Sequence, residues 1–129
     1  MVLVDSSVWI AVFKRDRPLD LTAHVDFDDV ATCLPIVQEV LQGFRDETAF
    51  RKARLAMFSL PIVDSPMDQA LVEQAVSLYR AARRAGITVR SSVDCLIAAS
   101  AVRHDLTVLH RDRDFPALAK IAALRQRAV

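Results

Sequence analysis

Four acidic residues are the candidates for chemistry in this sequence: Asp5, Glu39, Asp94 and Asp112. Asp5 directly follows the apolar run Val2–Val4. Asp112 follows a second apolar run, Thr107–His110, and Asp114 comes two residues later. Ligands collect beyond the carboxyl ends of the strands in open α/β sheets, so these acids could meet at one edge. Carboxylate oxygens suit Mg²⁺ or Mn²⁺, and pairs of such ions can activate a water and stabilise the leaving oxygen of a phosphodiester.

Asp94 lies in the segment 91–102, whose apolar side chains would cover nearly every direction of a helix. Such a helix is buried, and an isolated buried carboxylate is costly unless it is paired. A position in the first helical turn recovers only about 0.3–1 kcal/mol from the helix dipole. We therefore expect a cation beside Asp94, and both a structural arginine and a metal ion remain open.

Each of the other acids also has an ordinary structural explanation. Asp5 is a good cap for a helix that follows it. Glu39 lies on the flank of the apolar face of its helical segment, where a surface residue is expected. Asp112 and Asp114 could belong to a solvated charged loop.

The composition is that of one folded domain, which we place at residues 1–129. Apolar residues make up 53% of the chain and charged residues 26%, which is enough to bury a core. Lys and Arg number 17 against 16 Asp and Glu, so the basic field of a whole-molecule DNA-coating protein is absent. Gly43 and Gly86 are the only glycines, which excludes GxGxxG and Walker-A phosphate loops.

The histidines and cysteines form no metal or redox motif. His24, His104 and His110 have no ligand-pair spacing, so zinc is not expected. Cys33 and Cys95 are isolated within apolar runs and are expected to be reduced core residues. No charged leader with a long apolar stretch is present, and no run approaches the roughly 18 apolar residues of a membrane span, so we expect a cytoplasmic protein.

Short apolar runs alternate with longer helical segments along the chain. The runs predicted as strands are Val2–Val4, Val30–Cys33, 60–63 and Thr107–His110. The predicted helices are 7–13, 35–44, Glu47–Phe58, 66–85 and Ser92–Arg103. The segment 19–29 is ambiguous, and 118–129 is expected to hold a short helix and a last edge strand. The alternation predicts an α/β fold of three layers, α/β/α, around a parallel sheet of four to five strands.

The clearest helical pattern is at 66–85, where apolar residues recur at 3–4 spacing. Ser65 is expected to cap this helix, with Pro66 at its first position and Asp68 at the capping-box position. Arginines in its last turn suit the helix dipole, and Gly86 can provide a left-handed exit.

Four blocks of sequence occur in an order that is typical of a known family: VDSSVWI from residue 4, PIVQEVLQG from residue 35, SVDCLIAA from residue 92 and RDRDF from residue 111. Together they resemble the PIN-domain ribonucleases, in particular the VapC toxins of bacterial type II toxin–antitoxin pairs. The resemblance extends from residue 2 to about residue 120.

The resemblance implies an endoribonuclease that depends on Mg²⁺ or Mn²⁺, is made with a VapB-type antitoxin and forms a homodimer. Carried over position by position, the acidic quartet that binds metal and catalyses would be Asp5, Glu39, Asp94 and Asp112. Ser7 would support the site, and Asp114 would be a neighbouring acid. His110 stands where many members have Thr, which leaves the choice between residues 112 and 114 open.

Acids repel phosphate, so nearby cations must guide an RNA strand into such a site. The candidate RNA contacts are Arg83, Arg84, Arg90 and Arg111. Arg90 is preferred, because it comes just before the helix that carries Asp94, whereas the pair at 83–84 could equally be a solvated helix end. A structured RNA such as tRNA is implied by the resemblance alone. Four apolar residues could line an antitoxin groove or belong to the core: Phe44, Phe50, Leu55 and Phe58.

Three other functions use similar residues. A phosphotransfer enzyme of the haloacid-dehalogenase type needs a second Asp where this chain has Ser7, and a response-regulator receiver needs a Lys that residues 107–115 lack. The third is a catalytically inactive PIN-fold module that binds RNA or protein. The presence of all four acids argues against it.

Overall fold

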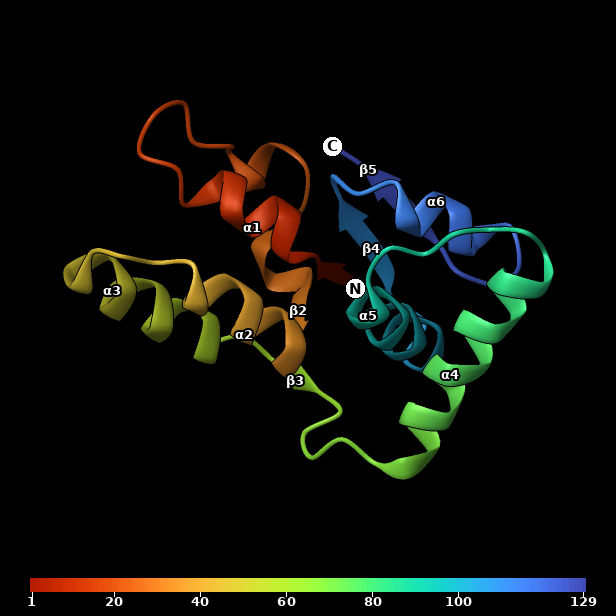
Figure 1. Cartoon of the computed structure of the whole chain (residues 1–129). Coiled ribbons are helices and arrows are strands. Elements are labelled where there is room, and N and C mark those ends of the chain that lie inside the picture. The colour runs from red at the N-terminus through yellow and green to blue at the C-terminus, as the bar shows by residue number, and fades with distance from the viewer.

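Five parallel strands form the centre of the computed structural model, which describes residues 1–129. The strands are β1 (Val2–Val4), β2 (Val30–Cys33), β3 (Ile62–Val63), β4 (Thr107–His110) and β5 (Gln126–Ala128). Their order across the sheet is β3-β2-β1-β4-β5, so the first strand is central and the chain extends the sheet in both directions from it (Figure 1). In register, Val2 of β1 pairs with Val30 of β2 and with Thr107 of β4.

Helices cover the sheet on both sides. They are α1 (Ser6–Val12), α2 (Leu34–Gln42), α3 (Glu47–Phe58), α4 (Gln69–Arg84), α5 (Ser92–Arg103) and α6 (Asp114–Ala119). Figure 1 shows α1, α2 and α3 on one side of the strands and α4, α5 and α6 on the other. This division follows from right-handed crossovers, because the chain reverses its direction across the sheet between β3 and β4. The α/β class, the layers and the parallel sheet predicted from the sequence are confirmed.

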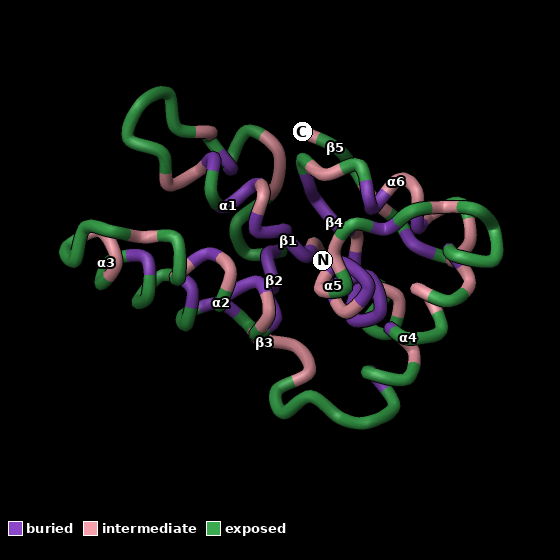
Figure 2. The backbone as a smooth tube through the Cα atoms, in the orientation of Figure 1, coloured by how far each residue is buried: buried purple, intermediate pink, exposed green.

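The core runs through the sheet and into both helical layers (Figure 2). The central strands β1, β2 and β4 are almost wholly buried, whereas the edge strand β5 is largely exposed. Helix α5 is buried on most of its surface, which agrees with its nearly unbroken apolar sequence. No helix of the chain combines the length and apolar character that crossing a bilayer requires.

Several predicted boundaries are wrong. The third strand is only Ile62–Val63, and the helix predicted within 118–129 already begins at Asp114, although the last edge strand is present. The ambiguous segment 19–29 forms two 3₁₀ turns, Leu21–Ala23 and Phe27–Asp29. Helix α2 ends at Gln42, before Phe44.

The start of α4 also differs from the prediction. Asp68, and not Ser65, is the N-cap: its Oδ1 accepts a hydrogen bond of 2.9 Å from the backbone N–H of Leu71, and the helix begins at Gln69. Pro66 therefore lies outside the helix. The end of the helix agrees with the prediction, since arginines occupy the last turn and Gly86 has a left-handed φ of 74°.

Candidate active site

Three carboxylates meet where the carboxyl edge of the sheet faces the start of α5. Asp94, Asp112 and Asp114 each offer an oxygen, and these oxygens lie within 4.8 Å of one another. Asp94 is in the first turn of α5, Asp112 lies in the loop after β4, and Asp114 begins α6. Asp94 and Asp114 are buried and Asp112 is half-buried. Segments far apart in sequence thus bring three carboxyl groups close together.

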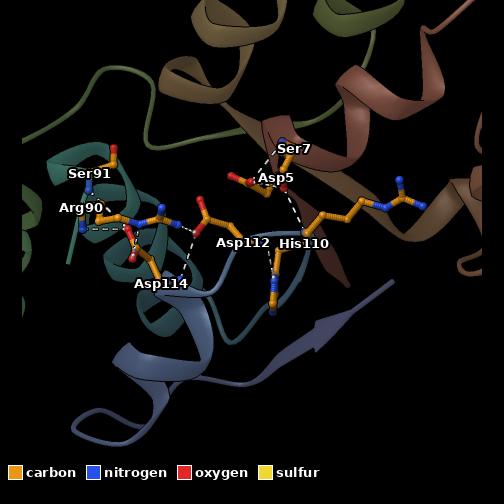
Figure 3. Close-up of polar contacts among 8 residues, drawn as sticks. Asp5, Ser7, Arg90, Ser91, His110, Asp112 and Asp114 are labelled. Carbon is orange, nitrogen blue, oxygen red and sulfur yellow. Dashed lines mark hydrogen bonds and ion pairs between the residues drawn. The ribbon is translucent and has the colours of Figure 1, made fainter. Parts of the chain in front are cut away.

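Backbone N–H groups hold Asp114 in this position. Its Oδ2 accepts hydrogen bonds from the N–H of Arg90, at 3.0 Å, and from that of Ser91, at 3.3 Å. Its own N–H donates to Oδ1 of Asp112 at 2.9 Å. The loop before α5 and the loop after β4 are therefore joined through one buried carboxylate (Figure 3).

Asp5 faces the same space from β1. Its carboxylate caps α1: Oδ2 accepts from the N–H of Ser7 at 3.1 Å and from the Ser7 hydroxyl at 2.5 Å. The same hydroxyl accepts a hydrogen bond of 3.0 Å from the N–H of Arg111, in the loop after β4. In Figure 3 Asp112 lies between Asp5 on one side and Arg90 with Asp114 on the other. Asp5 is both a helix cap and a member of the acidic group, so the two explanations of this residue do not exclude each other.

Glu39 approaches from α2, on the side of Asp5. It is half-buried, and its Oε1 accepts a hydrogen bond of 3.3 Å from the hydroxyl of Ser6. Burial, and next the negative charge of Asp5, raise the pKa of Glu39. The side chain therefore turns toward the acids, although its helical periodicity alone predicts a surface residue.

The site lacks the positive charge that its acids require. Burial, followed by a hydrogen bond with Asp114 and the charges of Asp112 and Asp5, raises the pKa of Asp94 to about 9. Burial also raises the pKa of Asp5, more than its hydrogen bonds with Ser7 lower it. Oδ2 of Asp94 and Oδ1 of Asp5 are buried and have no hydrogen-bond partner. Buried polar atoms are almost always paired. Asp64 Oδ2 is also buried and unpartnered, but Asp64 is paired with Arg103, whereas Asp94 and Asp5 form no ion pair, so a ligand is expected at these two.

The donor set fits a hard divalent cation. All of the converging atoms are carboxylate oxygens, with no thiol or imidazole among them, and oxygen ligands are what Mg²⁺ and Mn²⁺ prefer. A cation would also relieve the mutual repulsion that raises the pKa of Asp94. The unpartnered oxygens and the raised pKa values both indicate a group of carboxylates that a cation would stabilise.

The cation expected beside Asp94 is not an arginine. Asp94 forms no ion pair in the structure, and the guanidinium at this site belongs to Arg90, which lies 3.9 Å from Asp112 and 3.9 Å from Asp114. The Arg90 side chain is 54% exposed, so solvent weakens both contacts. Of the two alternatives left open by the sequence, a structural arginine for Asp94 is wrong.

The other predicted RNA contacts form no ion pair with the acids. Arg111 is in the loop after β4, but its Nε donates to the carbonyl of Val129 at 3.1 Å. Arg83 lies over the ring of Tyr79 at the end of α4, and Arg84 is exposed on the same helical turn. Arg90 is the one of the four whose guanidinium contacts the acidic cluster, and Figure 3 shows it directed at Asp112 and Asp114.

Asp114 is more central to the site than the resemblance implies. The resemblance makes it only a neighbour of the quartet, whereas it lies in the group of three and is more buried than Asp112. The one local signal was Phe115, a large apolar residue directly after Asp114 that is expected to be buried. His110 and Gln126 contact each other behind this loop, and nothing in their sequence spacing indicates it.

Comparisons with known proteins agree with this geometry. A family model described as the PIN domain matches residues 2–121, and the chain belongs to the PIN-domain family. A VapC ribonuclease of Mycobacterium bovis and ribonuclease VapC11 of Mycobacterium tuberculosis are each 37% identical over 97% of this chain and 96% of theirs. Similarity of this degree over the whole length places the chain among the VapC members of the family.

Solved structures of toxin–antitoxin complexes contain chains with the same fold. A chain of VapBC-5 from Mycobacterium tuberculosis is 27% identical and superposes with a TM-score of 0.69, covering 99% of this chain and 98% of that one. A chain of VapBC2 from Rickettsia felis, bound to a promoter DNA fragment, has a TM-score of 0.75 at 14% identity, covering 100% and 99%. At that lower identity the likeness concerns the fold alone.

Proposed function

We propose that this protein is a metal-dependent endoribonuclease and the toxin of a toxin–antitoxin pair. The observation that carries the proposal is the uncompensated charge at Asp94: a buried carboxylate with an unpartnered oxygen faces two further acids and no arginine of its own. The names of the VapC relatives, which describe ribonucleases, support the choice of RNA as the substrate.

The residues that would hold Mg²⁺ or Mn²⁺ are Asp94, Asp112 and Asp114, with Asp5 completing the site from β1. When bound, such an ion supplies positive charge that activates a water and stabilises the oxyanions of a phosphodiester undergoing hydrolysis. Ser7 fixes the orientation of Asp5 and ties the first loop to the loop after β4. The sequence left open whether Asp112 or Asp114 is the fourth acid. We propose that both contribute to the cation site.

Glu39 is proposed to act on the water that attacks the phosphorus. It is the acid on α2, it is half exposed, and its raised pKa brings it closer to the range in which a carboxylate accepts a proton well. The expected products are a 5′-phosphate and a 3′-hydroxyl.

Arg90 is proposed to receive a phosphate of the RNA. Its guanidinium is exposed and lies beside the acids, at the loop that leads into α5. RNA affinity should therefore fall as the salt concentration rises, because each neutralised phosphate releases counterions. Whether the natural substrate is a folded RNA such as tRNA is to be decided by sequencing the RNA ends formed after induced expression.

A VapB-type antitoxin is proposed as the protein partner. A groove of about 340 Å³ runs between α1 and the start of α3, with apolar walls and a basic rim. Its lining includes Ile10, Phe13, Phe44, Lys14 and Arg45. Ile10 is 52% exposed in the free chain, so an apolar segment with acidic residues would fit here. The sequence did not decide whether Phe44 and Leu55 line a groove or belong to the core. Phe44 lines this groove and packs against Phe13. Leu55 is exposed on α3.

A second copy of the chain is proposed to dock on the other helical layer. There α4 and α5 border an apolar hollow of about 370 Å³, and Val72 and Val76 of α4 are 43% and 51% exposed beside it. Two apolar side chains one helical turn apart on an exposed face are typical of a surface that another chain covers. Sedimentation of the purified chain and of a Val76→Glu variant tests this homodimer.

The experiment that tests the nuclease uses purified Asp94→Asn protein and a mixed RNA substrate with and without Mn²⁺. The wild-type protein should cleave only with the cation, and the variant should not cleave although it remains folded. Asp16→Asn is the matched control, because Asp16 is exposed and forms no hydrogen bond or ion pair in the structure. Cleavage by Asp94→Asn, or by the wild type in a chelator, would refute the proposed metal site. No cleavage by the wild type with Mn²⁺ would refute the nuclease and leave an inactive binding module as the explanation.

A further inference from the structure

His110 is the last residue of β4, and it is the one buried histidine of the chain, with 1% of its surface exposed. Its ring lies against the ring of Phe115, with the centroids 5.2 Å apart. Both ring nitrogens have a partner: Nδ1 is 3.1 Å from the backbone nitrogen of Asp112, and Nε2 is 2.6 Å from Oε1 of Gln126 on β5. The ring thus lies between the edge strand and the acidic loop.

These two contacts determine where the ring proton is. A backbone N–H can only donate, so Nδ1 must accept the hydrogen bond from Asp112 and carries no proton. A neutral imidazole then has its proton on Nε2, which donates to Oε1 of Gln126. The two observations agree, because the amide oxygen of Gln126 needs a donor and the N–H of Asp112 needs an acceptor.

Nδ1 of His110 is the first acceptor in a series of hydrogen bonds that runs through Asp112 and Asp114 to the loop before α5. Nδ1 of His110 fixes the N–H of Asp112, two residues later, in the way that an Asn or Asp oxygen does in an Asx turn. Asp112 repeats the pattern, because its Oδ1 accepts from the N–H of Asp114. Asp114 in turn accepts from the loop before α5. These hydrogen bonds connect the His110 ring to both Asp112 and Asp114.

We propose that His110 is a positioning residue for Asp112 and Asp114, and that Gln126 selects the ring tautomer that makes it an acceptor. Its consequence for cation binding and catalysis rests on the proposed function, whereas the tautomer and the Asp112 hydrogen bond do not. His110 is too buried to touch RNA, so its effect reaches the substrate only through the acids.

The test compares three variants with the wild type. His110→Leu keeps an apolar side chain of similar size but removes the acceptor, and His110→Asn restores an oxygen acceptor for the Asp112 N–H. Val108→Ala is the matched control: Val108 is buried on the same strand, two residues earlier and on the same face. Any loss that comes only from weaker packing should appear in His110→Leu and Val108→Ala alike.

Three readouts separate positioning from packing. Nitrogen-15 spectra of the wild-type imidazole should show the proton on Nε2. Hydrogen exchange of the Asp112 amide should accelerate in His110→Leu and remain slow in His110→Asn and Val108→Ala. In His110→Leu, the Mn²⁺ concentration that gives half of the maximal rise in melting temperature should increase about 10–100-fold, the range for partners that orient metal ligands. The kcat for RNA cleavage should decrease by a similar factor, and KM for RNA should be unchanged.

Two results would overturn the proposal. One is a proton on Nδ1 of the wild-type ring. The other is an Asp112 amide that exchanges no faster in His110→Leu than in Val108→Ala. If the wild-type protein binds no Mn²⁺, the proposed nuclease function fails, and the ring spectrum and the amide exchange still decide the role of His110.

Discussion

Two clusters of acids in this molecule have opposite electrostatic properties. At the end of β3, Asp64 lies 3.0 Å from Nη1 of Arg103 and 3.0 Å from Nε2 of His104. Asp68, the cap of α4, forms a 2.8 Å contact with Nη2 of the same arginine. At the end of β4, by contrast, Asp112 and Asp114 share one exposed arginine at 3.9 Å, and Asp94 has no cation at all.

The pKa directions follow from this difference. Burial alone would raise the pKa of Asp64, but hydrogen bonds from His104 and Ser100 and the charge of Arg103 lower it overall. The Arg103 contact also lowers the pKa of Asp68. Burial raises the pKa of Asp94 without any such compensation. A cluster whose charges are balanced internally joins two helices, and an unbalanced cluster is suited to hold a cation from solution.

The largest expected effect is that of Asp94→Asn on the response to divalent cations. The wild-type melting temperature should rise with Mn²⁺, because a ligand that binds only the folded state stabilises it. The variant should lose at least about 100-fold in Mn²⁺ affinity, above the range for partners that merely orient a ligand. Thermal scans over a Mn²⁺ series measure this. A loss of Mn²⁺ affinity in Asp64→Asn as large as that in Asp94→Asn would contradict the contrast between the two clusters.

Metal-free stability should fall as the pH rises from 5 to 8. Folded Asp94 keeps its proton up to a pKa of about 9, whereas an unfolded Asp loses it near 3.8. The folded state therefore binds more protons in this window, and raising the pH favours unfolding by at most about 1.4 kcal/mol per pH unit from this group.

Urea unfolding at a series of pH values measures this slope. The raised pKa values of Asp5 and Glu39 have the same sign. The lowered pKa values of Asp64 and Asp68 affect stability only below about pH 4, so they do not oppose the slope between pH 5 and 8. Asp94→Asn should flatten the slope, and an unchanged slope in that variant would mean that Asp94 is not the group responsible.

Asp64→Asn should destabilise the protein and leave the nuclease intact. The change removes hydrogen bonds to charged partners and should cost about 1–3 kcal/mol of unfolding free energy. The left-handed backbone at this residue, with φ of 54°, is one that Asn also tolerates, so the effect reports the ion pairs. Urea unfolding and RNA cleavage are to be measured on the same preparation. Loss of cleavage in a folded variant would contradict the separation of the two clusters.

Arg90→Ala should have the smallest effect. Its exposed contacts with Asp112 and Asp114 contribute little to stability, within about 0–1 kcal/mol. RNA affinity should weaken severalfold, and the salt dependence of binding should become shallower by about one phosphate contact. Fluorescence anisotropy with labelled RNA at several salt concentrations measures both. An unchanged salt slope would show that Arg90 does not neutralise a phosphate.

Most of the fold could be predicted from local patterns, and part of the site could not. The strands β1, β2 and β4 follow from continuous apolar runs, and the end of α4 from its arginines and Gly86. The start of α4 was wrong because Ser65, Pro66 and Asp68 are all good helix-start residues, and only the position of the preceding strand selects among them. Glu39 has a flanking position on its helix, and nothing local indicates that Ser6 lies beside it.

The amino-acid sequence alone determined the α/β alternation, the burial of α5 and the presence of acids at the ends of two strands, because these depend on side-chain polarity along single segments. The tertiary structure decided which charges meet. Asp94 and Arg103 are both on α5, and the path of this helix across the sheet places Asp94 near Asp112 and Asp114 and pairs Arg103 with Asp64. Electrostatic pairing acts over a few ångströms in space, and the sequence does not indicate which distant residues will come that close.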